Sequence, residues 1–289
     1  ESQVWEQAAK CLNLIAKEMS IGEVQQYLAP FVLDLAQDQW FTGRLSACAL
    51  IPCTYKHFPK NKTLLKQAFF KLCADKMPLV WWAAAMNIGD LARSVEPEII
   101  ESEVIPQFEK LSNDEQDYVK LITFDHLHDI AEISPNNETL IQITQNAIKD
   151  ASWKVRLSIA KQTDKLVQSF GKLVASHHLL DDLSQLLRDP EGEVKRELVH
   201  SFTKCIKLFE MSKIKEFLLP VFKDTYKDDY ANFKEGVAES ICEIAFILDE
   251  HDVTDELIPI LLELMKDKSS GVKIKVVEGL AKLSKVLGP

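Results

Sequence analysis

Histidine and cysteine side chains could hold a metal ion or act as nucleophiles, but in this sequence their spacing suits neither task. His126 and His128 lie two positions apart in a helical pattern, so they point to different faces of the helix. His177 and His178 are adjacent and no better placed. The cysteines include no Cys-x-x-Cys pair and lie within apolar patterns: Cys11, Cys48, Cys53, Cys73, Cys205 and Cys242. We therefore expect no metal site, and free cysteines that pack as small apolar residues in a reducing compartment.

The motifs of the common enzyme classes are not found in the sequence. It contains no Gly-rich phosphate loop, no Gly-x-Ser-x-Gly elbow and no His-Glu-x-x-His zinc motif. We therefore predict no catalytic residue and no cofactor, and a protein that is not an enzyme.

Aromatic and carboxylate side chains are concentrated in short segments between helical patterns. Tryptophan and tyrosine are enriched among the anchors of protein interfaces, and carboxylates favour a partner with basic patches. Any single tryptophan here fits a buried helix face equally well, whereas a row of them does not. The residues predicted to dock a partner are Trp40, Phe41, Pro78, Trp81, Trp82, Asp114, Glu115, Gln116, Asp117, Tyr118, Ser152, Trp153 and Lys154.

A repeated phrase, an aspartate followed five residues later by a valine, indicates the elements that position these side chains. It occurs at Asp75/Val80, Asp114/Val119, Asp150/Val155, Asp189/Val194 and Asp267/Val272, with Asp228/Phe233 and Asp38/Thr42 as variants. With Val4 added, the anchor residues 4, 42, 80, 119, 155, 194, 233 and 272 are 38, 38, 39, 36, 39, 39 and 39 residues apart. This regularity predicts a repeat protein.

Each anchor opens an apolar stripe with the period of a helix. Eight residues later stand Leu12, Leu50, Ile88, Leu127, Thr163, Phe202, Ile241 and Leu280, of which only Thr163 breaks the stripe. Eleven residues later stand Ile15, Cys53, Leu91, Ile130, Leu166, Cys205, Ile244 and Leu283.

A further helix is expected before each aspartate. Prolines eight residues before the aspartate predict a bend in that helix, at Pro30, Pro106, Pro220 and Pro259. We expect the aspartate carboxylate to accept N–H bonds from the start of the helix that follows.

A helix pair of about 39 residues is typical of a HEAT-type unit, whereas tetratricopeptide units have about 34. We predict an all-α fold, an α-α superhelix (HEAT-repeat solenoid) forming one domain over residues 1–289. The predicted repeats are 1–20 (second helix only), 21–59, 60–97, 98–135, 136–172, 173–211, 212–250 and 251–289. Neither end has a polar capping repeat and the chain starts at Glu1 within a helical pattern, so we expect a fragment of a longer protein.

The charge of the chain disfavours two classes of partner. Its formal net charge is −10 and it has no run of Lys and Arg, whereas a protein that binds nucleic acid must neutralise several phosphates. No apolar run approaches the roughly 18–20 residues that span a bilayer. We therefore expect neither nucleic acid nor a membrane as a partner.

Three turn segments resemble phrases of the scaffold (A, or PR65) subunit family of protein phosphatase 2A. Residues 38–48 (DQWFTGRLSAC) are similar to its D-W-F-T-S-R-x-S-A-C phrase, residues 112–120 (SNDEQDYVK) to S-D-E-Q-D-x-V-R, and residues 149–156 (KDASWKVR) to K-S-W-R-V-R. The resemblance is clear from about Val4 to Val155 and looser to Pro289. It departs at Trp81 and Trp82, where the family has two arginines.

The resemblance implies a non-catalytic scaffold that spans the second helix of the third repeat to about the tenth. The turns would dock regulatory (B-type) subunits, while the catalytic subunit would bind mainly through repeats that this chain lacks. It also implies a cytoplasmic location, with the nucleus as a second compartment, and no homo-oligomer. The alternative is a HEAT-repeat adaptor or karyopherin-like cargo carrier, which would be favoured by Asp and Trp concentrated on the inner helices rather than in the turns.

Overall fold

The computed structural model describes residues 2–57, 62–228 and 230–287, and these residues form helices without β-strands. The predicted all-α fold is therefore confirmed. The chain consists of two compact units, residues 1–139 and 140–289. Within each unit the helices alternate between one that precedes a turn aspartate, called here the first helix, and one that follows it, the second helix.

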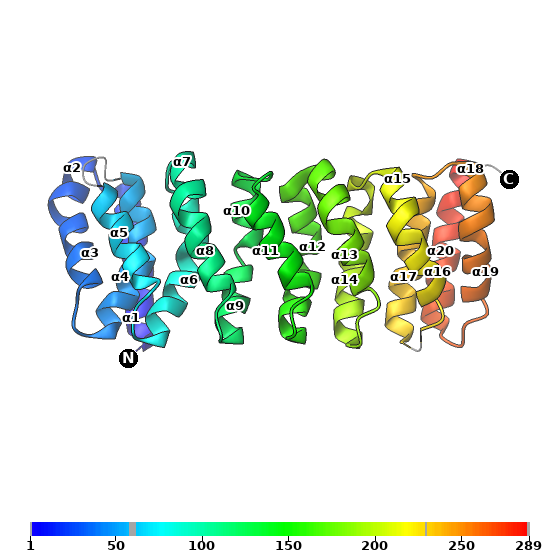
Figure 1. The fold of residues 1–289 in the computed structure, drawn as a ribbon, viewed down its shortest axis with the longest axis horizontal. Helices are drawn as coiled ribbons and strands as arrows, with labels where there is room; N and C mark the ends of the chain where they lie inside the picture. Colours follow the sequence, from blue (N-terminus) through cyan, green and yellow to red (C-terminus); the bar gives the residue numbers. More distant parts are fainter. Residues whose placement is uncertain (1, 58–61, 229, 288–289) are drawn as a thin grey trace. The chain divides into compact units, whose positions relative to one another are not determined.

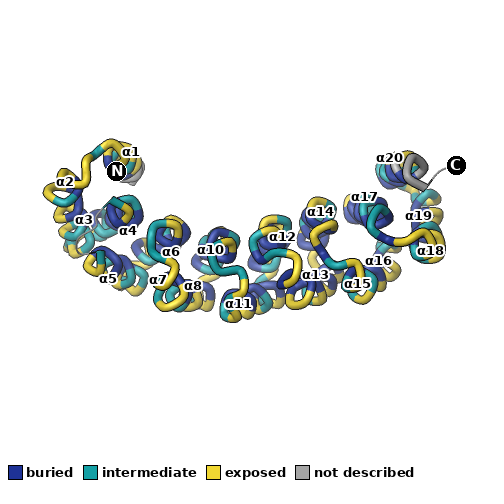
Figure 2. Tube along the Cα trace, turned by 90° about the horizontal axis from the view of Figure 1, so that it is seen from above, coloured by how far each residue is buried: buried dark blue, intermediate teal, exposed yellow. Residues whose placement is uncertain are grey.

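In the first unit the two kinds of helix form two layers (Figure 2). The second helices are α1 (Ser2–Glu18), α4 (Phe41–His57), α6 (Pro78–Ala92) and the interrupted pair α9 (Asp117–Phe124) and α10 (Leu127–Ile133). The first helices are α2 (Ile21–Glu23) with α3 (Ala29–Ala36), α5 (Lys62–Leu72), and α7 (Pro97–Ile99) with α8 (Ile105–Ser112). The turns that join first to second helices lie at the lower edge of this unit in Figure 1.

The second unit repeats this arrangement. Its first helices are α11 (Glu138–Ile148), α13 (Leu180–Leu186), α15 (Met211–Lys213) with α16 (Leu219–Thr225), and α18 (Glu250–Asp252) with α19 (Ile258–Leu264). Its second helices are α12 (Trp153–Val174), α14 (Gly192–Cys205), α17 (Ala231–Ala245) and α20 (Ser270–Leu287). Helix α12 turns sharply at Gly171, whose φ of 76° is readily adopted only by a residue without a Cβ atom.

The core lies between the two layers and contains most of the anchor residues that the structure describes, whereas Thr42 is half-buried. The anchors from Val80 onward are fully buried, including Phe233 in the aromatic variant of the phrase. Thr163 does not break the stripe as predicted. It is fully buried, because its Oγ1 donates a hydrogen bond of 2.9 Å to the carbonyl of Ile159 and so leaves only the methyl group to pack. Ile15 is the opposite case, since the stripe predicts it inside and it is 54% exposed.

The prolines lie next to wide helical turns. Pro30, Pro106, Pro220 and Pro259 each take the second position of an α-helix that follows a five-residue π-helical turn. These turns are Val24–Leu28, Ile100–Val104, Ile214–Leu218 and Val253–Leu257, and a further one without proline is Ala175–Leu179. A wider turn accommodates the proline ring, which in a regular α-helix collides with the carbonyl four residues back. The structure thus replaces the predicted simple bend with a local change of helix type.

Candidate functional site

Each turn aspartate fixes the start of a second helix. One carboxylate oxygen accepts the backbone N–H two residues later at 2.8 to 2.9 Å, at Asp38, Asp75, Asp114, Asp150, Asp189, Asp228 and Asp267. The prediction that these carboxylates accept N–H bonds at the helix start is confirmed. The donor is the residue that caps the helix or directly precedes it, and not a residue of its first turn. This bond holds the backbone of the turn in one conformation.

A basic residue six positions after one aspartate reaches the aspartate of the next turn, and we call this arrangement the turn ladder. In the first unit, Arg44 contacts Asp75 with two parallel bonds, Nε–Oδ2 of 2.7 Å and Nη2–Oδ1 of 2.9 Å. Its Nη1 also donates to the carbonyls of Asp38 and Gln39, at 2.8 and 3.1 Å. Burial alone would raise the pKa of Asp75, but the bonds from Arg44 lower it below its usual value. Neighbouring turns are therefore clamped to one another.

The second unit has the same pairs of a cation with the aspartate of the next turn, and we call each such pair a rung of the turn ladder. Arg156 contacts Asp189 at 2.6 Å (Nε–Oδ2) and 3.1 Å (Nη2–Oδ1), and its Nη1 donates to the carbonyls of Asp150 and Ala151. Further rungs join Lys195 to Asp228 and Lys234 to Asp267. The hydrogen bond from Lys234 holds the pKa of Asp267 below its usual value.

The ladder is interrupted in the first unit. The residue six positions after Asp75 is Trp81, and its indole stacks on the ring of Tyr118 with centroids 6.2 Å apart and planes 27° apart. Asp114 accepts the N–H of Gln116, and no cation among the described residues pairs with its carboxylate. An aromatic pair therefore replaces the expected ion pair.

The predicted docking residues of the first unit lie at its turns, with different degrees of exposure. Trp40 is 73% exposed and lies between α3 and α4, while Phe41 is half-buried at the start of α4. Pro78 begins α6 and is exposed; Trp81 and Trp82 are half-buried. In the third turn Asp114 is half-buried, whereas Glu115, Gln116, Asp117 and Tyr118 are exposed. The structure brings Trp81 and Tyr118 into contact across two turns.

The remaining predicted residues belong to the second unit. Ser152 is half-buried, Lys154 is exposed, and Trp153 is 37% exposed at the start of α12. Sequence reasoning missed Tyr230, which is 57% exposed, with Lys195 Nζ 5.2 Å from its ring centroid. Its position could have indicated it, because Tyr230 follows Asp228 by two residues, as Trp40 follows Asp38.

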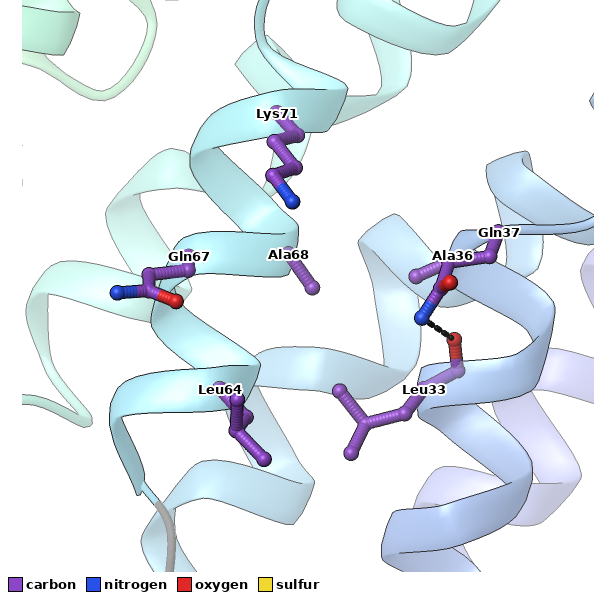
Figure 3. Close-up of a pocket in the computed structure, with 7 residues that line it drawn as sticks. All are labelled: Leu33, Ala36, Gln37, Leu64, Gln67, Ala68 and Lys71. Carbon is purple, nitrogen blue, oxygen red and sulfur yellow. Dashed lines mark hydrogen bonds between the residues drawn. The ribbon is translucent and has the colours of Figure 1, made fainter.

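A cavity of about 200 Å³ lies between the first helices α3 and α5 (Figure 3). Leu33 and Leu64 face each other across it, and its other lining residues are Ala36, Gln37, Gln67, Ala68 and Lys71. The lining supplies one cation and two amides but neither a nucleophile nor a carboxylate.

In the described part of the chain, no group of three or more His, Cys, Asp or Glu side chains is placed to hold a metal ion. Nor is any helix there long and apolar enough to span a bilayer.

The sequence is similar to scaffold subunits of protein phosphatase 2A, which confirms the resemblance of the turn phrases. The A-type regulatory subunit of protein phosphatase PP2A from Schizosaccharomyces pombe is 33% identical over 177 residues, which cover 59% of this chain and 30% of that protein. The scaffold subunit of Dictyostelium discoideum is 37% identical over 109 residues, which are 37% of this chain and 19% of that protein. The beta isoform of the human 65 kDa A-type regulatory subunit is 35% identical, with 33% and 16% covered. The chain thus spans less than a third of the length of these relatives.

Solved structures with a similar fold include nuclear import proteins. A chain from a structure of Kap95p binding to RanGDP matches with a TM-score of 0.70 and 15% identity, over 99% of this chain and 40% of that one. Importin beta crystallised in ammonium sulfate matches with a TM-score of 0.66 and 13% identity, over 98% and 38%. At this level of identity the likeness concerns the fold alone, and it confirms a HEAT-type helical repeat.

A family model also matches the sequence. The model described as "PIK3R4-like, middle domain" matches residues 58–229 and 93–287, which together cover most of the chain. The chain therefore belongs to the PIK3R4-like middle-domain family, and its curated relatives include A-type regulatory, or scaffold, subunits of protein phosphatase 2A.

Proposed function

We propose that the chain is part of a scaffold subunit of protein phosphatase 2A that docks a regulatory, B-type subunit on its turns. The names of the curated relatives support this assignment, and so do the turn phrases that the chain shares with them. As a scaffold it is not an enzyme; it binds two proteins at once and thereby raises the effective concentration of each for the other.

The exposed turn tryptophans are the observation that carries the proposal. Trp40 is 73% exposed, and its own N–H is bonded to Asp38, so the backbone that presents the indole is fixed. Trp153 follows Ser152, whose N–H is bonded to Asp150 in the same way. Large aromatic side chains on a rigid backbone lose little entropy on binding, which makes them effective interface anchors.

The same placement argues against a karyopherin-like carrier. The tryptophans whose side chains the structure describes lie in a turn or within the first five residues of a second helix, and not farther along it. The catalytic subunit, on this proposal, binds mainly through repeats outside residues 1–289. The protein acts in the cytoplasm, with the nucleus as a second compartment.

The test uses the full-length protein with purified B-type subunits of one class at a time. Trp40→Ala and Trp153→Ala should each weaken binding by about tenfold or more in calorimetric titrations, as loss of an interface anchor does. Circular dichroism should show unchanged helical content. Tyr27→Ala and Leu173→Ala are matched controls, because these side chains are 61% and 66% exposed but lie away from the turns that contain the aspartates.

The docking assignment is wrong if both tryptophan variants bind every regulatory class with unchanged affinity. The scaffold function itself is tested by purifying the full-length protein from its source and identifying its companions by mass spectrometry. A complex that contains phosphatase catalytic and regulatory subunits is expected. A complex with transport cargo and no phosphatase subunit would contradict the proposal.

A further inference from the structure

The interrupted rung at Asp114 lacks a donor that its counterparts possess. In the two complete arginine rungs, one guanidinium contacts the aspartate of the next turn and also donates to two carbonyls of its own turn. The equivalent acceptors around Trp81 are the carboxylate of Asp114 and the carbonyls of Asp75 and Lys76. Indole has a single N–H and no charge, so Trp81 cannot replace the five N–H donors of an arginine.

The surroundings of Asp114 are suited to a planar cation. The carboxylate is half-buried and uses one oxygen for the N–H of Gln116, at 2.8 Å. Trp81 at the preceding turn and Tyr118 at the turn of Asp114 itself, which is 45% exposed, provide stacked aromatic rings. Glu115, the next residue in the sequence, is exposed and adds a second carboxylate to this turn. Aromatic faces and carboxylates together attract a guanidinium more than they attract any other protein group.

We propose that an arginine side chain of a docked protein partner completes the turn ladder at Asp114. The guanidinium pairs with the Asp114 carboxylate and lies against the Trp81–Tyr118 pair, as Arg44 pairs with Asp75 within the chain. The inference rests on the proposed function, because it takes the partner to be a protein held on the turns of the first unit. Lysine fits less well, since it can form neither the two parallel bonds nor the ring stack of a guanidinium.

The test measures how two short peptides bind to the protein. One is acetylated and amidated Ser-Gly-Arg-Gly-Ser, and the other is the same peptide with citrulline in place of arginine. Citrulline keeps the planar shape and removes the charge. The reporter is the indole N–H signal of Trp81 in the chain labelled with ¹⁵N-tryptophan, assigned with Trp81→Phe. We expect a saturable shift with the arginine peptide and affinity about fivefold lower for the citrulline peptide, the size of one partly exposed ion pair.

Two variants distinguish a specific contribution of the Asp114 carboxylate from a general effect of the protein's negative charge. Asp114→Asn keeps an acceptor for the Gln116 N–H, so the turn is retained, and it should lower affinity for the arginine peptide about fivefold. Asp34→Asn removes an exposed carboxylate on α3 and should leave affinity unchanged. Equal binding of the two peptides, or an unchanged affinity of Asp114→Asn, would overturn the proposal. Failure of the scaffold function is seen separately, as unchanged binding of regulatory subunits by the Trp40 and Trp153 variants.

Discussion

The rung between Arg156 and Asp189 offers the sharpest test of how the turns are held together. Replacing Arg156 with alanine removes two bonds to Asp189 and two to backbone carbonyls. The Asp189 side chain is 3% exposed and that of Arg156 is 14% exposed, so water cannot readily replace the guanidinium. The substitution therefore leaves a carboxylate buried without its cation.

The expected cost follows from that burial. Breaking a buried ion pair by removing one partner destabilises a protein by roughly 3–5 kcal/mol. Asp189 keeps one hydrogen bond, from the N–H of Glu191 at 2.8 Å, which favours the lower end of this range, about 3 kcal/mol.

Arg188 is the matched control, since its pair with Asp224 has side chains 36% and 65% exposed. An exposed pair contributes about 1 kcal/mol or less, so Arg188→Ala should have little effect.

The measurement is urea unfolding followed by circular dichroism, together with amide hydrogen exchange in the turns of residues 150–156 and 189–195. Hydrogen exchange is needed because repeat proteins can open one repeat at a time. A loss of about 3 kcal/mol corresponds to exchange roughly a hundredfold faster at these turns. If Arg156→Ala loses no more stability than Arg188→Ala, the ladder is not a determinant of stability and the reasoning is refuted.

Two further predictions concern pH and packing. A hydrogen bond from Lys62 is the main cause that lowers the pKa of Glu96 from 4.5 to about 2, so Glu96 stabilises the fold above pH 4.5 and loses this effect as pH falls through about 2. Urea unfolding should show Glu96→Gln less stable than the parent at pH 7, with the gap closing between pH 4.5 and 2; a constant gap would contradict this. A Cβ atom at Gly236 would lie 2.3 Å from a methyl group of Val199, so Gly236→Ala should cost about 1–3 kcal/mol in the same assay. At Gly22 a Cβ atom would meet only the Ser20 hydroxyl, at 4.0 Å, so Gly22→Ala should be neutral or slightly stabilising, and equal effects at both sites would refute the packing argument.

The fold could be predicted from the sequence because its determinants are local and repeated. The apolar stripe after each anchor and the aspartate five residues before it recur in register, and the structure buries Val80, Val155 and Val194 completely. The carboxylate bonds of the turns follow from residue type alone, since aspartate accepts its own backbone two residues on.

Other features depend on contacts between repeats, which a single repeat cannot reveal. A basic residue directly follows the anchor at Arg156, Lys195 and Lys234, yet nothing local indicates that Arg44 reaches Asp75, 31 residues away. The stack of Trp81 on Tyr118 is a contact of the same kind. Exposure is equally non-local: Ile15 fits the apolar stripe, but it is exposed because no neighbouring side chains cover it. The candidate site was therefore predicted as a set of residues, and its internal pairing was not.

The π-helical turns give the repeat length a structural meaning. Successive turn aspartates are 37, 39, 36, 39, 39 and 39 residues apart. Each 39-residue interval contains a π-helical turn, whereas the intervals of 37 and 36 residues contain the α-helices α5 and α11 and no such turn among their described residues. A wide turn accommodates an extra residue within a helix. The first helices can thus differ in length while the aspartates of the complete rungs stay opposite their cations, as Asp75 does after 37 residues and Asp189 after 39. The six residues from aspartate to cation, where the structure describes them, contain no such wide turn. A one-residue deletion there would therefore rotate the cation away from its partner and remove the ion pair that joins two turns.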